Sequence, residues 1–266
     1  MSLYAISDLH LAMSIEKPMD VFGARWANYM DKLKENWNSI VSDEDYVIVP
    51  GDISWATYLE QAVDDFKFIH ELPGKKIISK GNHDYWWTTK SKLDKFINDN
   101  GFTSISFMHN NSYLIGRAAV CGTRGWETPG EIGFSSEDSK IYQRELQRLE
   151  LSLKNAIGNI AAATQATDSA AGISTENGVC AAPAGAGPTV MDKGAVLVAA
   201  MHYPPYNSKG DFSGFTEIMK KYGVKLCIYG HLHGDACRNA IEGVVDGIMF
   251  RLVSADHLGF SPLLLY

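Results

Sequence analysis

Short polar clusters repeatedly follow buried apolar runs along this chain of 266 residues. In the first hundred residues, apolar runs of strand length alternate with segments of helical periodicity, which predicts βαβ units and a mostly parallel sheet. Open sheets of this kind bring the carboxyl ends of their strands to one edge. The polar residues that follow the strands should therefore meet at one site. They form five clusters, which are Asp8-Leu9-His10, Gly51-Asp52, Gly81-Asn82-His83-Asp84, His202 and Gly230-His231-Leu232-His233.

The expected elements cover most of the chain. Strands are expected at 3–6, 46–49, 75–78, 112–115, 118–121, 195–201 and 224–229, and helices at 19–41, 58–72, 91–100, 137–154 and 215–222. Residues 236–266 predict three or four antiparallel strands. Residues 157–193 are rich in Ala, Gly, Ser and Thr and lack aromatic residues, which predicts a surface insertion or a mobile loop. We expect one domain over 1–266, in which a βαβ half precedes a β-rich half.

Charge and cysteine content limit the partners and the compartment. The net charge of −7 gives no long-range attraction to nucleic acid or to an anionic membrane. Cys121, Cys180, Cys227 and Cys237 form no C-x-x-C pair, so reduced thiols are expected. The first residues lack a basic leader, and no apolar run reaches the ~20 residues of a membrane span. We expect a cytoplasmic protein without a membrane partner, and the sequence does not predict its oligomeric state.

The polar clusters carry the ligand chemistry of a metal site. Side chains two residues apart in an extended segment project to the same side, so Asp8 and His10 can converge on one ion. His231 and His233 can likewise reach one cavity. Carboxylate and imidazole ligands suit Mn, Fe, Zn or Ni, and the absence of thiolate ligands disfavours a soft site. Two divalent ions, balanced by Asp8, Asp52 and a bridging hydroxide, would leave one positive charge to receive a phosphate monoanion.

The motif order D-x-H, GD, GNHD, H and GHxH resembles that of calcineurin-like metallophosphoesterases, and the resemblance extends from Asp8 to His233. Segments such as Gly51-Asp52-Ile53-Ser54-Trp55 resemble a bacterial branch of phosphohydrolases without a settled substrate. The resemblance implies a four-layer α/β/β/α sandwich with mixed sheets. It also implies two metal ions, of which one is held by Asp8, His10 and His233, the other by Asn82, His202 and His231, and both by Asp52.

The same resemblance implies metal-dependent hydrolysis of a phosphomonoester or a phosphodiester. A hydroxide that bridges the two ions, roughly 3.5–4 Å apart, would attack phosphorus in line. His83 would bind a phosphoryl oxygen and protonate the leaving alkoxide, a contribution typically of ~10²–10⁴-fold. Asp84 is expected to hold the ring of His83 in position. The candidate substrate contacts are Asn82, His83 and Arg124.

Simpler interpretations compete at several positions. Asp8-Leu9-His10 or Gly51-Asp52 alone is an ordinary turn or cap, and the motifs 81–84 and 230–233 are moderately specific. Their ordered occurrence after predicted strands is what favours a metal site. Arg124 fits a phosphate contact or a surface position. Five aromatic residues would either pack in the core, the commoner fate, or wall a pocket for a base or sugar, and they are Trp55, Tyr85, Trp86, Trp87 and Trp126. Two other functional classes stay open, a non-catalytic scaffold of the same fold that binds protein and a nuclease on the same core.

Overall fold

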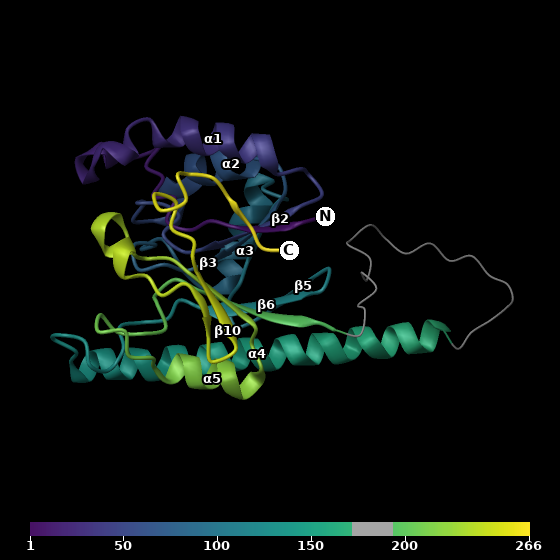
Figure 1. The fold of residues 1–266 in the computed structure, drawn as a ribbon. Coiled ribbons are helices and arrows are strands. Elements are labelled where there is room, and N and C mark those ends of the chain that lie inside the picture. Colours follow the sequence, from purple (N-terminus) through teal and green to yellow (C-terminus); the bar gives the residue numbers. More distant parts are fainter. Residues whose placement is uncertain (172–193) are drawn as a thin grey trace, which may run out of the picture.

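Two mixed β-sheets, packed face to face, form the centre of the computed structural model, which describes residues 1–171 and 194–266 (Figure 1). The first sheet has the strand order β11-β1-β2-β3-β4 and the second β5-β6-β7-β8-β10-β9. The strands of the first sheet are β1 (Leu3–Ala5), β2 (Tyr46–Pro50), β3 (Lys75–Ser79), β4 (Ile105–Phe107) and β11 (Leu263–Leu264). Those of the second are β5 (Tyr113–Ile115), β6 (Ala118–Thr123), β7 (Val196–Met201), β8 (Leu226–Tyr229), β9 (Gly243–Val245) and β10 (Ile248–Leu252). In each sheet the inner strands are parallel to one another, so the predicted α/β class with mixed sheets is confirmed.

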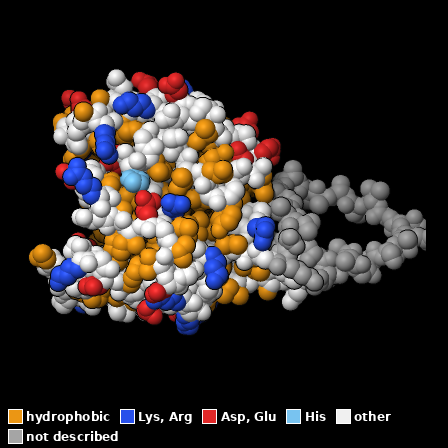
Figure 2. All heavy atoms as spheres, in the orientation of Figure 1, with side chains coloured by type: hydrophobic (Ala, Val, Ile, Leu, Met, Phe, Trp, Pro, Cys, Tyr) orange, Lys and Arg blue, Asp and Glu red, His pale blue; other side chains and the backbone are white. Residues whose placement is uncertain are grey.

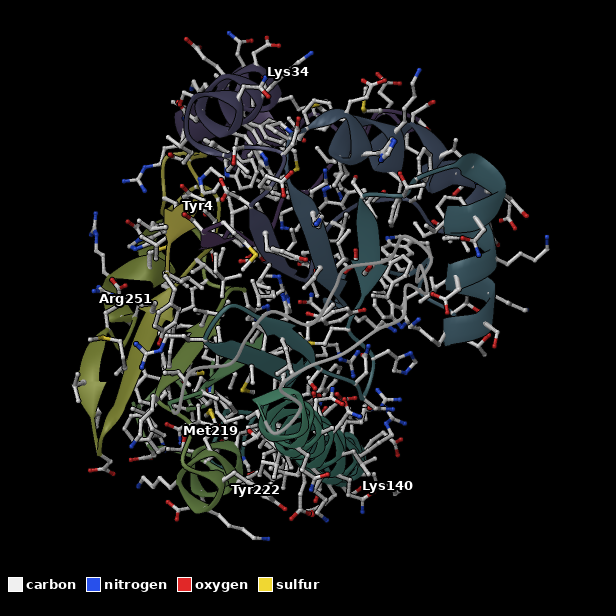
Figure 3. All side chains as sticks on the ribbon, turned by 90° about the vertical axis from the view of Figure 1, so that its right-hand side faces the viewer. Tyr4, Lys34, Lys140, Met219, Tyr222 and Arg251 are labelled. Carbon is white, nitrogen blue, oxygen red and sulfur yellow. The ribbon has the colours of Figure 1, made fainter. Side chains whose placement is uncertain are left out.

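Helices cover the outer face of each sheet. The first sheet is covered by α1 (Tyr29–Ile40), α2 (Val63–Glu71) and α3 (Lys90–Asn100), and the second by α4 (Ser136–Ala171) and α5 (Gly214–Tyr222). Figure 3 shows Lys34 of α1 and Lys140 of α4 on opposite outer sides of the two sheets. Within the described residues, no helix is both long and apolar enough to cross a membrane.

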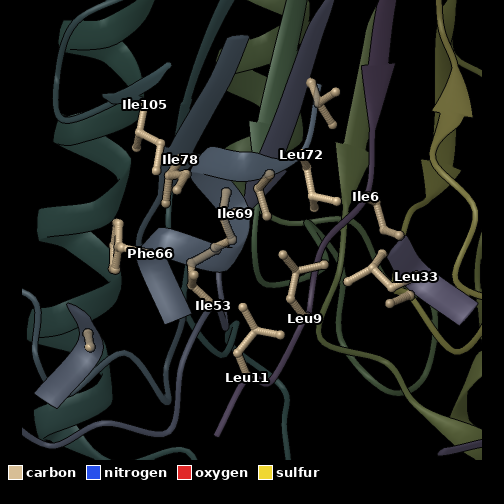
Figure 4. Packing of buried hydrophobic residues seen from close by; sticks show 14 of the residues in the cluster. Ile6, Leu9, Leu11, Leu33, Ile53, Phe66, Ile69, Leu72, Ile78 and Ile105 are labelled. Atoms are coloured by element: carbon tan, nitrogen blue, oxygen red, sulfur yellow. The ribbon is translucent and has the colours of Figure 1, made fainter. Parts of the chain in front are cut away.

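Alternation along the strands explains how both faces of each sheet are filled. In β2, Val47 and Val49 face the helices, whereas Ile48 faces the second sheet. The helix side of the first sheet also buries Leu33 of α1 and Phe66 of α2 (Figure 4). Because both faces are covered, such strands appear in the sequence as continuous apolar runs.

The region 19–41 differs from the predicted single helix. Two short 3-10 turns, Met19–Phe22 and Ala24–Trp26, precede α1. Gly23 at φ 124° and Asn28 at φ 53° take positive values that an α-helix does not contain. The periodic apolar stripe is therefore broken, and Phe22 is 58% exposed rather than buried.

The second half of the chain also differs from the prediction. Helix α4 continues to Ala171, so the first part of the expected insertion 157–193 is helical, and the rest lies outside the described residues, as does Cys180. Strands β9 and β10 pair antiparallel, as predicted within 236–266, whereas β10 pairs parallel with β8 on its other side. Strand β11 leaves this sheet and pairs with β1 of the first sheet.

Candidate metal centre

The predicted ligands gather where the carboxyl ends of strands from both sheets meet. Strands β1, β2, β3, β7 and β8 are followed in turn by Asp8, Asp52, Asn82, His202 and His231. Backbone hydrogen bonds join these strand ends. The N–H of Asp8 donates to the carbonyl of Gly51 at 3.0 Å, and the N–H of His10 donates to that of Asp52 at 2.9 Å. Parallel register thus brings motifs that are far apart in sequence to one edge.

Asp8, His10 and His233 form a first group of ligands. Their ligand atoms all lie within 4.8 Å of one another. Nε2 of His233 lies 3.2 Å from Oδ1 of Asp8 and 3.4 Å from Nε2 of His10. Nε2 of His10 also lies 3.7 Å from Oδ2 of Asp52, so the Asp52 carboxylate adjoins this group.

Asp8, Asp52 and His202 form a second group, with ligand atoms again within 4.8 Å of one another. Oδ1 of Asp52 lies 3.5 Å from Nε2 of His202. The side-chain oxygen of Asn82 lies 2.6 Å from that Nε2 and 3.0 Å from Nδ1 of His231. The structure therefore brings all seven predicted ligands together, with one oxygen of Asp52 toward each group.

The lone pairs of His202 and Asn82 face each other, an arrangement that a cation would relieve. Nδ1 of His202 lies 3.1 Å from the Pro50 carbonyl, which only accepts, so Nδ1 carries the hydrogen. Burial lowers the pKa of His202 to about 3, so the ring is neutral and Nε2 is bare. This bare nitrogen faces the acceptor oxygen of Asn82 at 2.6 Å. Two acceptors at that distance repel, and the pair fits a metal ion that both could bind.

The carboxylate of Asp256 orients His233 and was not predicted as a site residue. Its Oδ1 accepts from Nδ1 of His233 at 2.8 Å, and its Oδ2 accepts the N–H of Gly234 at 2.9 Å. This bond turns Nε2 of His233 toward the first group, as second carboxylates commonly do for metal-binding histidines. Burial would lower the pKa of His233, but Asp8 and Asp256 raise it to about 10. The available sequence signal was its place just after β10, at a strand end like those of the ligands.

The buried carboxyl groups of Asp8 and Asp52 have pKa values that move in opposite directions. Burial would raise the pKa of Asp8, but His233 and His202 hold it well below its usual range. Burial, Asp8 and Asp84 raise the pKa of Asp52 well above its usual range. A bound cation would hold both carboxyls ionised, because its charge dominates the local field.

Four of the ligands have left-handed backbone conformations. The φ angles are 60° at Asp8, 46° at His10, 52° at Asp52 and 73° at His231. Residues other than glycine rarely adopt this region, and such strain, of order 1–3 kcal/mol each, persists where the surroundings enforce it. One enforcing contact lies at Gly81, where an added Cβ would collide with the backbone nitrogen and carboxylate of Asp52. Of the eight residues other than glycine with positive φ in the described chain, four are predicted ligands.

Asp84 does not hold the ring of His83, contrary to the sequence expectation. Its carboxylate accepts the backbone N–H groups of Asp52 at 2.9 Å and Gly81 at 2.7 Å, and the indole N–H of Trp86 at 3.1 Å. Nδ1 of His83 has no hydrogen-bond partner among the described residues. Burial raises the pKa of Asp84 to about 6, although these backbone donors oppose the rise. Asp84 instead joins the two loops that carry Asp52 and His83.

A cavity of about 770 Å³ opens beside His10, His83 and His233. The Trp55 ring stacks on His10 with 4.9 Å between ring centroids and lies 4.4 Å from that of His83. Nζ of Lys17 lies 3.7 Å from the centroid of Trp55. The apolar and aromatic side chains in the lining are Ile15, Met19, Phe22, Trp26, Trp55 and Tyr85. Trp55 and Tyr85 thus wall the cavity, the less favoured of the two sequence interpretations.

Arg124 does not line the cavity beside His83. Its guanidinium lies over the ring of Trp126, 4.3 Å from the centroid, and 3.7 Å from a carboxylate oxygen of Glu145. These contacts place the Arg124 side chain in a second pocket, described below. Arg124 thus lines a different pocket from His83.

The sequence model of the calcineurin-like phosphoesterase family matches residues 1–235. The chain belongs to this family. The family match includes all seven ligands and His83, whereas Asp256 lies beyond it. Membership thus agrees with a metal-dependent hydrolase, and the two ligand groups are the candidate places for its ions.

Solved structures similar to this phosphoesterase share little sequence with it. They include the protein of unknown function AQ665 from Aquifex aeolicus, at 15% identity and a TM-score of 0.47 over 99% of this chain and 95% of that chain. Phosphopantetheinyl hydrolase (PptH) from Mycobacterium tuberculosis matches at 16% and 0.44, over 95% and 88% of the two chains. TT1561 of Thermus thermophilus matches at 12% and 0.43, over 87% and 81%. No curated protein is similar enough to this chain to count as a relative.

Proposed function

We propose that this chain is a dinuclear metal-dependent phosphoesterase that hydrolyses a phosphomonoester or a phosphodiester. The observation that carries the proposal is the position of Asp52, whose two oxygens lie 3.7 Å from His10 and 3.5 Å from His202, one in each ligand group. When bound, two divalent ions such as Mn, Fe, Zn or Ni would supply Lewis acidity that lowers the pKa of water and polarises a phosphoryl oxygen.

His83 is positioned to act as the general acid. Its backbone N–H donates to Oδ1 of Asp52 at 2.9 Å, which fixes the residue next to the proposed shared ligand. Its half-buried ring lines the cavity and lies against Trp55. Burial and the nearby Lys17 lower the pKa of His83, so its protonated ring is a stronger acid than an exposed imidazole. A ring in this place can bind a phosphoryl oxygen and pass its proton to the leaving oxygen.

The cavity walled by Trp55 and Tyr85 supports an ester whose alcohol part is apolar or carries a ring. Aromatic walls bury such groups with large contact area. Lys17, held over Trp55, would add a cation for a negative substituent on that alcohol. The leaving group would thus extend from His83 into this cavity.

Two other functional classes receive less support. A protein-binding scaffold needs no metal ligands, yet the seven candidate ligands lie together and four of them have left-handed backbone torsions. The net charge of −7 weighs against a nuclease. Figure 2 shows acidic and basic side chains interspersed on the face drawn, without a broad basic field.

An assay with chromogenic phosphate esters tests the proposal. The parent protein would be loaded with Mn²⁺, Zn²⁺ or Fe²⁺ and given p-nitrophenyl phosphate and bis(p-nitrophenyl) phosphate. Metal-stimulated turnover should disappear in Asp52→Asn and persist in His70→Ala, which alters a histidine of α2 outside the site. No turnover of either ester with any ion would favour the scaffold, and cleavage confined to DNA would favour the nuclease.

A further inference from the structure

A second pocket, of about 370 Å³, shares no lining residue with the aromatic cavity. Its lining includes Lys80 after β3, Arg124 after β6, Arg148 on α4 and Thr89 just before α3. Among the described residues that line it, the only carboxylate belongs to Glu145. Three cationic side chains therefore share one pocket with a single acid.

Glu145 is already occupied by its neighbours. Its Oε1 accepts from Nη1 of Arg148 at 2.7 Å and lies 3.7 Å from Nη2 of Arg124. Its Oε2 accepts from the hydroxyl of Thr123 at 2.6 Å. One carboxylate with these partners cannot also neutralise Lys80, so the pocket keeps an excess of positive charge.

Several polar side-chain atoms in the pocket lack partners. Nζ of the half-buried Lys80 makes no hydrogen bond or ion pair with any described residue. Nε of Arg124 and Nδ1 of His109 are buried without a partner in the described chain. The Thr89 side chain does not cap α3, whose first turn has no acidic residue, so the positive end of that helix adds to the field. Unpaired buried donors are costly, and an anion would satisfy several at once.

We propose that this pocket binds a phosphate-type dianion at a site separate from the metal centre. Tetrahedral oxygens suit guanidinium, ammonium and helix N–H donors, and the charge excess suits a dianion. The pocket shares a backbone wall with the metal centre, because Lys80 precedes Gly81 and the carbonyl of Arg124 accepts the N–H of His202 at 3.1 Å. The anion is either a second phosphate of a bound substrate or free inorganic phosphate, which present the same oxygens.

Lysine labelling of the full protein tests the site without any turnover. Trace acetic anhydride would be applied with and without inorganic phosphate, and acetylation of Lys80 and of the exposed Lys92 would be followed by peptide mass spectrometry. Phosphate should slow labelling of Lys80 about tenfold and leave Lys92 unchanged, in metal-loaded and in chelated protein. Arg148→Gln should abolish the protection. Arg144→Gln is the matched control, because Arg144 lies 3.9 Å from Glu145 without lining the pocket.

Equal labelling of Lys80 with and without phosphate would overturn the proposal, as would full protection in Arg148→Gln. This result is independent of the proposed hydrolysis, since an inactive protein would still show protection. Kinetics then separate the two sources. A KM that rises about tenfold in Arg148→Gln only for esters with a second phosphate would assign the pocket to substrate. Lost protection with unchanged KM for both kinds of ester would assign it to free phosphate.

Discussion

The carboxylate of Asp84 accepts the backbone N–H of Asp52 at 2.9 Å, although the two residues lie 32 positions apart. The same carboxylate accepts the N–H of Gly81 at 2.7 Å, so one buried side chain joins two motif loops. Asp52 in turn accepts the N–H of His83 at 2.9 Å. The position of the proposed shared ligand therefore depends on an acid that neither lines the cavity beside His83 nor bonds the ring that it was expected to hold.

Asp84→Asn should destabilise the two loops that Asp84 joins, rather than impair proton transfer from His83. The amide nitrogen cannot accept, so at least one buried N–H loses its partner at a cost of about 1–3 kcal/mol. We expect a lower Tm and weaker metal binding, measured by calorimetry and chelator competition. Asp64→Asn, an exposed acid of α2, is the control. A stronger dependence of rate on leaving group in Asp84→Asn would restore a role for Asp84 on His83.

His83→Ala should slow the hydrolysis of esters with poor leaving groups most. Loss of a general acid typically costs ~10²–10⁴-fold, and p-nitrophenolate needs little protonation. We therefore expect a large fall in kcat for alkyl phosphates, a small fall for p-nitrophenyl phosphate and unchanged metal content. Equal losses across a series of leaving groups would assign His83 to binding alone.

Asp52→Asn should reduce the content of both metal ions. The variant keeps one side-chain oxygen and loses the charge that adjoins both ligand groups. Elemental analysis after dialysis, in parallel with the parent protein and Asp64→Asn, measures the number of ions per chain. If Asp52→Asn retained two ions at parental affinity, Asp52 would not be shared.

Asp256→Asn should weaken metal binding through His233. Loss of a carboxylate that orients a metal-binding histidine commonly costs 10–100-fold in metal affinity. The bond at risk joins Oδ1 of Asp256 to Nδ1 of His233 at 2.8 Å. Competition with a chelator measures the affinity, and Asp235→Asn supplies an exposed control next to the same loop. An unchanged affinity would show that the orientation of His233 does not depend on Asp256.

The buried, neutral rings of His202 and His231 should each cost the chelated protein stability as the pH falls from about 6.5 toward 4. Burial lowers the pKa of His202 to about 3 and that of His231 to about 4, whereas unfolded histidines titrate near 6.5. Between these pKa values the unfolded chain binds more protons than the folded chain, so these histidines lower the free energy of unfolding as the pH decreases. His233, with its raised pKa, acts in the opposite sense only above pH 6.5. The raised pKa values of Asp52 and Asp84 act in the opposite sense in this range, so the histidine contribution is measured as a difference. Between pH 7 and 5 in EDTA, the change in Tm should be more negative in the parent protein than in His231→Gln, and equal changes would contradict the buried neutral ring of His231.

The convergence of the candidate ligands could be predicted because their signal is local. Each lies directly after an apolar run, and parallel strands bring such positions to one edge. The end of the helix expected at 91–100 could also be predicted from the sequence, because Gly101 was the expected C-cap and it ends α3 at φ 70°. The interruption of the helix expected at 19–41 could not be predicted. The apolar spacing continues through Gly23 and Asn28, but the backbone leaves the helical conformation there.

Other features depend on packing that no local pattern records. The expected partner of Asp84 was its neighbour His83, but the nearest donors in space belong to Asp52 and Gly81. Asp256 lay outside the recognised motif order. The cationic pocket combines Lys80 and Arg148 from elements on different sheets and layers. Such pairings require the tertiary structure.

The left-handed torsions at Asp8, His10, Asp52 and His231 also bear on how related chains could change over time. A related protein that no longer bound metal ions would still carry the strained backbone torsions at these positions, without the metal binding that justifies their cost. Glycine would then be the residue that relaxes each turn without altering its path. Glycine at several of these positions in a homologous sequence would accordingly indicate a protein that has lost catalysis and kept the fold.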